Sequence, residues 1–93
     1  GFYNEVLEKG NYIRKSIESF NNKVVLKTKG IGLMIGIETN IESSIIEEKA
    51  RKKGLLILTA GKNVLRFLPP LTISYKEIDE ALEILKDILL EIN

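Results

Sequence analysis

Apolar residues recur at three- and four-residue steps in three stretches of the chain, which is the spacing of one helix face. The first stretch covers residues 2–20 and ends at the pair Asn21-Asn22, and the second lies between Ser44 and Gly54. The third follows Ser74 and carries the stripe Ile78, Ala81, Leu82, Leu85, Ile88, Leu89 and Ile92. The spacing therefore predicts three helices.

Local signals mark several of the predicted helix ends. Ser44 with Glu47, and Ser74 with Glu77, have the S-x-x-E spacing of a capping box. Gly54 stands where a C-terminal cap is expected. A glycine in the middle of the first helix, at position 10, costs helix stability and is expected to mark close packing against a neighbouring segment.

Four shorter runs are typical of strands: Lys23–Lys27, Leu33–Glu38, Leu55–Thr59 and Val64–Leu68. Gly30 and Gly32 predict a tight turn between the first two runs, and Gly36 is expected to permit a close backbone approach. A hairpin-length turn joins the last two runs, and Pro69-Pro70 ends the final strand. The order α-β-β-α-β-β-α predicts one α+β domain over residues 1–93, with a small, mostly antiparallel sheet.

Both faces of the predicted sheet carry apolar side chains. In the last run, Leu65 and Phe67 share one face, whereas Val64, Arg66 and Leu68 share the other. The helices of one small domain cover one face, so the second face needs cover from the remaining helix or from protein outside this chain.

Composition excludes several classes of function. The chain has no Cys and no His, which removes disulfides, most zinc sites and every Ser-His or Cys-His mechanism. A net charge of +1 with interspersed Lys and Glu predicts no nucleic-acid partner, and no apolar run reaches the length of a membrane span. A cytoplasmic protein is the default expectation, and the absence of an initiator Met suggests an excised fragment.

Arg66 is the candidate binding residue, because it places a permanent charge inside an otherwise apolar strand. Arg presents a planar fork that matches a carboxylate at two points. The alternative is an edge-strand Arg that is solvated or paired with a nearby Glu. Glu38 as an acid–base and Lys62 as a nucleophile are weaker candidates, since neither has a partner in its motif.

The glycines at 30, 32 and 36 do not fit a phosphate-binding loop. The third glycine is one position late for the dinucleotide fingerprint. The segment also precedes a strand, whereas that fingerprint follows a strand and opens a helix. No catalytic residue and no metal ligand set is therefore predicted within this chain.

Two runs of the sequence nevertheless match a known family. Thr59–Ile73, with its R-x-x-P-P-L motif, and Lys29–Glu38, written K-G-I-G-L-M-I-G-I-E, resemble the C-terminal segment of class III pyridoxal-phosphate-dependent aminotransferases, within them the acetylornithine enzymes. The likeness extends in order over essentially the whole chain. Lys29 departs from the family, which commonly has Arg at this position, so the charge is kept but the fork is lost.

The resemblance implies that the chain is the C-terminal small domain of a fold-type-I aminotransferase, packed on a large cofactor-binding domain. The intact, homodimeric parent is expected to transfer an amino group from N-acetylornithine to 2-oxoglutarate in arginine biosynthesis, with pyridoxal phosphate as cofactor. The Arg of the family motif falls on Arg66 and is expected to hold a substrate carboxylate. The cofactor lysine lies upstream in the family, so the fragment alone is expected to be inactive.

Three alternatives stay open from the residues. One is another class III enzyme, such as an ornithine aminotransferase. The second is a free-standing regulatory module that binds a small amino acid through Arg66. The third is a docking domain whose second sheet face is a partner surface.

Overall fold

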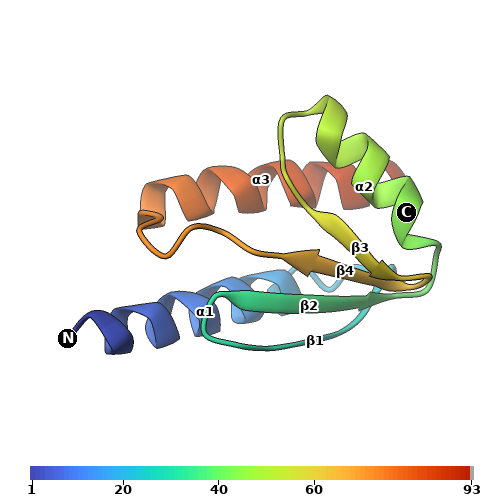
Figure 1. The fold of residues 1–93 in the computed structure, drawn as a ribbon. Helices are drawn as coiled ribbons and strands as arrows, with labels where there is room; N and C mark the ends of the chain where they lie inside the picture. The colour runs from blue at the N-terminus through green and yellow to red at the C-terminus, as the bar shows by residue number, and fades with distance from the viewer. Residues whose placement is uncertain (93) are drawn as a thin grey trace.

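The computed structural model describes residues 1–92 and contains three helices and one four-stranded sheet (Figure 1). The elements follow the predicted order: α1 (Phe2–Ser19), β1 (Val25–Ile31), β2 (Met34–Thr39), α2 (Ser43–Lys52), β3 (Leu58–Gly61), β4 (Val64–Phe67) and α3 (Tyr75–Ile92). The strands lie in the order β1-β2-β4-β3, and every neighbouring pair is antiparallel. The α+β class and the element order are confirmed.

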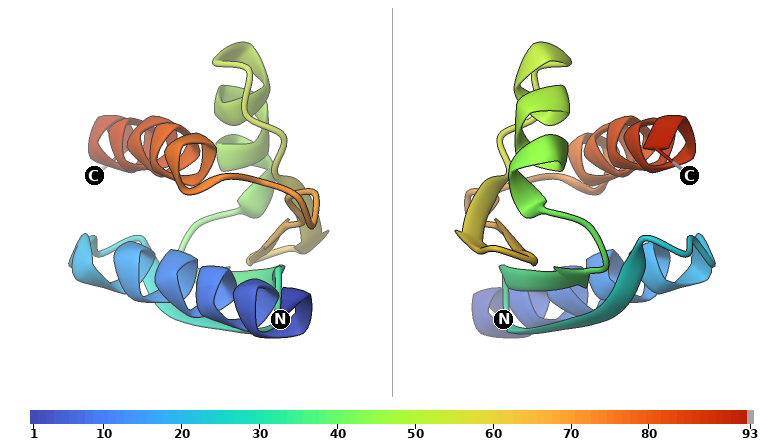
Figure 2. Two further views of the ribbon diagram at one scale, coloured as in Figure 1. Left: turned by 90° about the vertical axis from the view of Figure 1, so that its left-hand side faces the viewer. Right: turned by 90° about the vertical axis from the view of Figure 1, so that its right-hand side faces the viewer.

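One face of the sheet and the three helices enclose the core, to which α2 contributes Ile46 and Ala50. Alternation buries Ile35 and Ile37 of β2 and Leu65 and Phe67 of β4 on this face. The helices contribute a buried stripe to the same core: Ile13 and Ile17 of α1, and Ile78, Leu82, Leu85, Ile88 and Leu89 of α3. The left panel of Figure 2 shows α3 on one side of β3 and β4, and no segment of residues 1–92 on their other side.

Gly10 lets α1 touch the turn between β1 and β2. A Cβ at this position would lie 2.0 Å from the carbonyl oxygen of Gly32, which leaves no room for a side chain. Gly32 itself has φ +57°, as the first central residue of a type II′ hairpin turn requires. The expected close packing at Gly10 and the expected tight glycine turn are therefore both confirmed.

Gly36 does not have the expected role within this chain. A Cβ added there would meet Lys29 Cγ and the Lys29 carbonyl oxygen at 3.6 Å, which is ordinary van der Waals contact. No segment among residues 1–92 approaches the backbone of Gly36 closely enough to require a glycine.

Two of the three predicted helix caps are confirmed. Ser74 and Glu77 form the reciprocal capping box of α3, with N–H to side-chain oxygen distances of 3.0 and 3.1 Å. Gly54 has φ +80°, and the Leu55 N–H donates to the Ala50 carbonyl at 2.8 Å, as in a Schellman motif.

The capping box predicted at Ser44 and Glu47 is wrong. The N-cap of α2 is Glu42, which makes no side-chain cap hydrogen bond, and the helix begins one residue before Ser44. Glu47 Oε2 instead accepts a hydrogen bond from the Thr59 N–H of β3 at 3.2 Å. A tertiary contact therefore uses the carboxylate that the local pattern assigned to the helix end.

The strand boundaries also shift. The first strand was expected at Lys23–Lys27 but continues to Ile31, because β2 pairs with it up to the turn. The third begins at Leu58 rather than Leu55. In the β3–β4 register Leu58 faces Arg66. The residues before Leu58 would therefore face the segment that leads into Pro69 and Pro70. Because proline has no backbone N–H, strand pairing cannot continue there.

Candidate functional site on the open face of the sheet

The sheet face opposite the helices carries the candidate site. We call it the open face and define it by the outward positions of the strands and the residue after β4: Lys27, Lys29, Ile31, Met34, Gly36, Glu38, Leu58, Val64, Arg66 and Leu68. Ile31 is 82% exposed, Met34 55% and Leu68 50%. Large apolar side chains thus remain in solvent on this face, as the sequence pattern predicted.

Arg66 lies at the centre of this face. The register places it opposite Gly36 of β2 on one side and Leu58 of β3 on the other, and Lys29 of β1 follows Gly36 in the same row. The Arg66 side chain is exposed, and no carboxylate within residues 1–92 lies at ion-pair distance from its guanidinium. Within the described residues the Arg66 charge therefore has no carboxylate partner.

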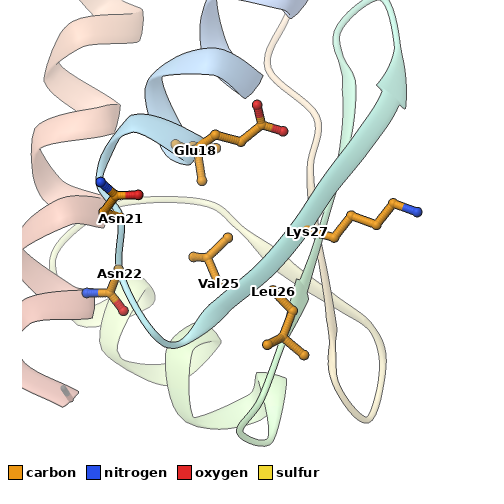
Figure 3. A pocket seen from close by; sticks show the side chains of 7 residues that line it. Glu18, Asn21, Asn22, Val25, Leu26 and Lys27 are labelled. Carbon is orange, nitrogen blue, oxygen red and sulfur yellow. The ribbon is translucent and has the colours of Figure 1, made fainter.

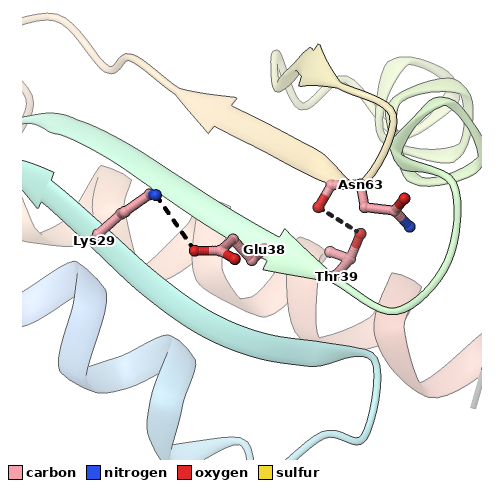
Figure 4. A network of polar contacts seen from close by, with 4 residues as sticks. All are labelled: Lys29, Glu38, Thr39 and Asn63. Atoms are coloured by element: carbon pink, nitrogen blue, oxygen red, sulfur yellow. Dashed lines mark hydrogen bonds and ion pairs between the residues drawn. The ribbon is translucent and has the colours of Figure 1, made fainter.

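Glu38 shares the open face with Arg66 but is paired with another cation. Lys29 Nζ lies 3.4 Å from Glu38 Oε2 across the β1–β2 ladder (Figure 4). The two side chains are 63% and 35% exposed, so water screens the pair. The ion pair thus joins the first and the last residue of the family-like run Lys29–Glu38.

A hydrogen-bond network fixes the strand that carries Arg66. The Thr39 hydroxyl donates to the Asn63 carbonyl at 3.3 Å (Figure 4). The Thr39 N–H donates to the same carbonyl at 2.8 Å, and the Asn63 side-chain amide donates to the Ile41 carbonyl at 2.8 Å. The buried Ser43 hydroxyl donates to the Gly61 carbonyl at 2.6 Å. These bonds tie the β3–β4 hairpin to the corner between β2 and α2, so β4 has one fixed position.

An apolar groove of about 350 Å³ adjoins the open face. It runs beside the β1–β2 turn and the double proline, and its lining includes Tyr3, Val6, Ile31, Met34, Leu68 and Leu71. The groove has no charged lining residue, so it provides a surface for packing rather than a site for polar chemistry.

A second hollow, of about 420 Å³, lies between the end of α1 and the start of β1 (Figure 3). Its acidic residue, Glu18, accepts a hydrogen bond from the Thr28 hydroxyl at 2.6 Å. Figure 3 shows the Lys27 side chain extending away from the hollow. Its lining therefore directs no unpaired charge inward, and it is not a candidate site.

The two groups with shifted pKa values belong to helix contacts. The Tyr12 hydroxyl donates to Asp79, and this bond raises the pKa of Tyr12, because ionisation would lose the bond and face a negative charge. Hydrogen bonds to the Ser74 backbone N–H and, to a smaller extent, to the Ser74 side chain hold the pKa of Glu77 below its usual value. Neither residue lies on the open face, so these shifts reflect the α1–α3 contact and the cap of α3 and do not indicate acid–base chemistry.

The described residues do not by themselves fit a pyridoxal phosphate site. No lysine within residues 1–92 is buried, and the glycine-containing segment at 30–36 forms a strand hairpin rather than a helix N-terminus. Over the same residues no group of acidic side chains could hold a metal ion. None of the helices described is both long and apolar enough to cross a membrane.

The sequence placed Arg66 on an outward strand face but missed the pairing of Glu38. Glu38 was considered as an acid–base and Lys29 only as a variant of the family motif, whereas the structure brings the two together. Only the β1–β2 register could have revealed this pair. Lys62 lies in the exposed β3–β4 turn, where its carbonyl accepts a hydrogen bond from the Ser43 N–H at 2.7 Å.

Several curated proteins with sequences similar to this chain are acetylornithine aminotransferases. The chain is 50% identical to the acetylornithine aminotransferase of Caldanaerobacter subterraneus and 47% identical to that of Listeria innocua. These alignments cover 99% and 96% of this chain but only 24% of each relative. The chain therefore spans about a quarter of the length of the curated relatives it matches.

Solved structures share the fold at lower identity. An N-acetylornithine aminotransferase from Stenotrophomonas maltophilia has a TM-score of 0.83 at 30% identity, covering 94% of this chain and 26% of that one. A phospholyase from Arthrobacter has a TM-score of 0.85 at 31% identity, covering 95% of this chain and 24% of that one.

The family assignment comes from a direct match. The sequence profile described as "Aminotransferase class-III" matches residues 1–89, which is nearly the entire chain. The resemblance carried by the R-x-x-P-P-L and K-G-I-G-L-M-I-G-I-E runs is thereby confirmed. This chain belongs to the class III aminotransferases.

Proposed function

We propose that this chain is the C-terminal small domain of a pyridoxal-phosphate-dependent aminotransferase that transfers an amino group from N-acetylornithine to 2-oxoglutarate. The proposal includes a place in arginine biosynthesis, a cytoplasmic location and a homodimeric parent. Identities of 50% and 47% to acetylornithine aminotransferases favour this substrate.

Within this proposal Arg66 binds a substrate carboxylate. The observation that carries it is the position of Arg66, which stands on the open face without a carboxylate partner among residues 1–92. A guanidinium binds a carboxylate through two parallel hydrogen bonds, which fixes both the distance and the orientation of the substrate. The open face provides the room, and the Thr39–Asn63 network keeps β4 in place.

The remaining parts of the active site are proposed to lie outside this chain. When bound, pyridoxal phosphate supplies the electron sink for amino-group transfer, and the protein supplies binding and orientation. Because the described residues do not form a cofactor site, the large domain of the same enzyme is the proposed partner. Its surface would cover the open face and the apolar groove.

The Arg66→Ala variant of the intact enzyme tests the anchor role. We expect the KM values for N-acetylornithine and 2-oxoglutarate to rise by roughly 10- to 100-fold, the size of a lost charge-assisted hydrogen-bond pair. For Arg66→Lys we expect KM values between those of the unaltered enzyme and those of Arg66→Ala, since lysine keeps the charge but loses the planar fork. Cofactor content, measured by its absorbance, is expected to be unchanged.

Arg51→Ala serves as the matched control, because Arg51 is an exposed arginine that lies on α2 and not on a strand of the sheet. It is expected to leave both KM values unchanged. Unaltered kinetics for both substrates in Arg66→Ala would refute the anchor role.

The isolated chain distinguishes this proposal from an amino-acid-binding module. Purified residues 1–93 with added pyridoxal phosphate are expected to show no transaminase activity. Calorimetric titration with free amino acids is expected to show no submillimolar binding. Turnover in the first experiment, or tight binding in the second, would contradict the assignment to a larger enzyme.

A further inference from the structure

Glu38 lies between Lys29 and Arg66 on the open face, with a third cation, Lys27, directly opposite it. In the sheet register it is opposite Lys27 of β1 and Val64 of β4. Lys29 and Arg66 each lie two residues beyond those partners, on the same face as Glu38. Such diagonal neighbours are about 7–8 Å apart at the backbone, a distance that long side chains bridge. The register therefore places the Glu38 carboxylate within reach of either cation.

The structure shows which cation holds it. Glu38 Oε2 is 3.4 Å from Lys29 Nζ, whereas no carboxylate of residues 1–92 is paired with Arg66. Gly36, which lies between Lys29 and Arg66 in their row, has no side chain that separates the two halves of the face. No side chain at position 36 thus stands between the Glu38 carboxylate and the Arg66 side of the face.

A Glu38 carboxylate that turned to Arg66 would be an internal competitor of the substrate. A tethered group acts at a high effective concentration, so even a weak contact with Arg66 would lower the fraction of enzyme that can bind an external carboxylate. The apparent affinity falls by that same fraction.

We propose that Lys29 is a positioning residue that holds Glu38 away from Arg66 and so keeps the Arg66 guanidinium free for a substrate carboxylate. The inference rests on the proposed role of Arg66 as a carboxylate anchor. A single charge is sufficient to hold Glu38 in this role, and no two-point contact is needed.

The test uses the intact enzyme and compares substitutions at Lys29. Lys29→Met keeps the length of the side chain but removes its charge. We expect it to raise the KM for 2-oxoglutarate, and its dissociation constant measured by calorimetry, by about fivefold, the scale of an exposed ion pair. The kcat is expected to be unchanged, because only the fraction of free Arg66 is altered. Lys29→Arg is expected to keep the original values.

The decisive variant is the double substitution Lys29→Met with Glu38→Gln. If Glu38 is the competitor, removing its charge restores the affinity that Lys29→Met loses, and Glu38→Gln alone does not raise the KM. A merely structural role of the Lys29–Glu38 pair predicts the opposite, since the double variant would stay as impaired as Lys29→Met.

Lys27→Met is the matched control. Lys27 is an exposed lysine of the same strand and faces Glu38 directly, but no ion pair joins it to Glu38 in the described structure. Lys27→Met removes the same charge as Lys29→Met and is expected to leave the KM for 2-oxoglutarate unchanged. An equal rise in both lysine variants would show that net charge, not the Lys29–Glu38 pair, sets the affinity, and would overturn the inference.

The substitutions at Arg66 and Lys29 separate the role of Lys29 from the role of Arg66. If Arg66→Ala raises the KM but Lys29→Met does not, the role of Lys29 is wrong and the anchor stands. If Arg66→Ala has no effect, the anchor role itself is wrong.

Discussion

Gly10 and Gly36 show how the surroundings of a single residue decide what it contributes. The backbone of Gly10 lies against the β1–β2 turn, where even one additional carbon would overlap the Gly32 carbonyl. Gly36 has room for a methyl group within this chain, since its nearest neighbours would be at 3.6 Å. The same residue type is required by packing at one position and not at the other.

Gly10→Ala is therefore expected to destabilise the chain by about 1–3 kcal/mol, because α1 or the turn must move to admit the methyl group. The measurement is urea unfolding followed by circular dichroism. Gly36→Ala is the matched control and is expected to change the unfolding free energy by less than about 0.5 kcal/mol. Equal effects of the two substitutions would contradict the close contact at Gly10.

Residue patterns revealed the position of Arg66 but not its surroundings. Alternation along Val64–Leu68 is a local property, and it correctly placed Arg66 opposite the face of Leu65 and Phe67. The Lys29–Glu38 pair depends on how β1 aligns with β2, which no single strand encodes. The role of Arg66 in binding stays a prediction until the substitutions are made.

At the level of elements, the two S-x-x-E runs of the chain have different outcomes. At α3 the pattern acts locally, and Ser74 and Glu77 satisfy each other's backbone N–H groups. At α2 the backbone of β3 takes Glu47, and the helix already begins at Ser43, so Ser44 is not its N-cap. A capping signal can thus be read from sequence only where no neighbouring strand competes for its side chains.

The capping box of α3 predicts a pH dependence of stability. The hydrogen bonds from Ser74 lower the pKa of Glu77 in the folded chain below its ordinary value of 4.5. The folded state therefore favours the charged carboxylate, and the resulting stability is complete above pH 4.5 and is lost as the pH falls through the folded pKa.

This dependence can be measured by following the Glu77 carboxyl carbon by NMR and the melting temperature between about pH 3 and 6. Glu77→Gln is expected to remove its share of the pH dependence. Ser74→Ala is expected to raise the pKa of Glu77 toward its ordinary value only in part, because the backbone N–H at position 74 remains. A normal pKa for Glu77 in the unaltered chain would show that the box does not persist in solution.

At the level of the whole molecule, the order of the seven elements was predictable but the order of the strands was not. Helix and strand periodicities are local, so they reveal each element in turn. The central pair β2–β4 joins segments that α2 and β3 separate along the chain. That pairing places Gly36 beside Arg66 and so creates the open face.

The open face predicts that the isolated chain associates with itself. Its exposed Ile31, Met34 and Leu68 form apolar surface that a stable monomer rarely leaves uncovered. Sedimentation velocity over a range of concentrations is expected to show a rising mean mass. Met34→Lys is expected to reduce this association, whereas Ile45→Lys, at an exposed apolar position on α2, is expected to leave it unchanged. A concentration-independent monomer would contradict the prediction.

The irregular register between Val25 and Lys27 has a consequence for how β1 meets other chains. β1 is an outer strand of seven residues, so the backbone groups on its free side could recruit a further strand. The bulge interrupts the regular spacing of those groups, and the charged Lys27 beside it must be desolvated before another strand can add. The chain thereby discourages fibril-like growth along this margin, and contact with other proteins is directed to the apolar side of the sheet instead.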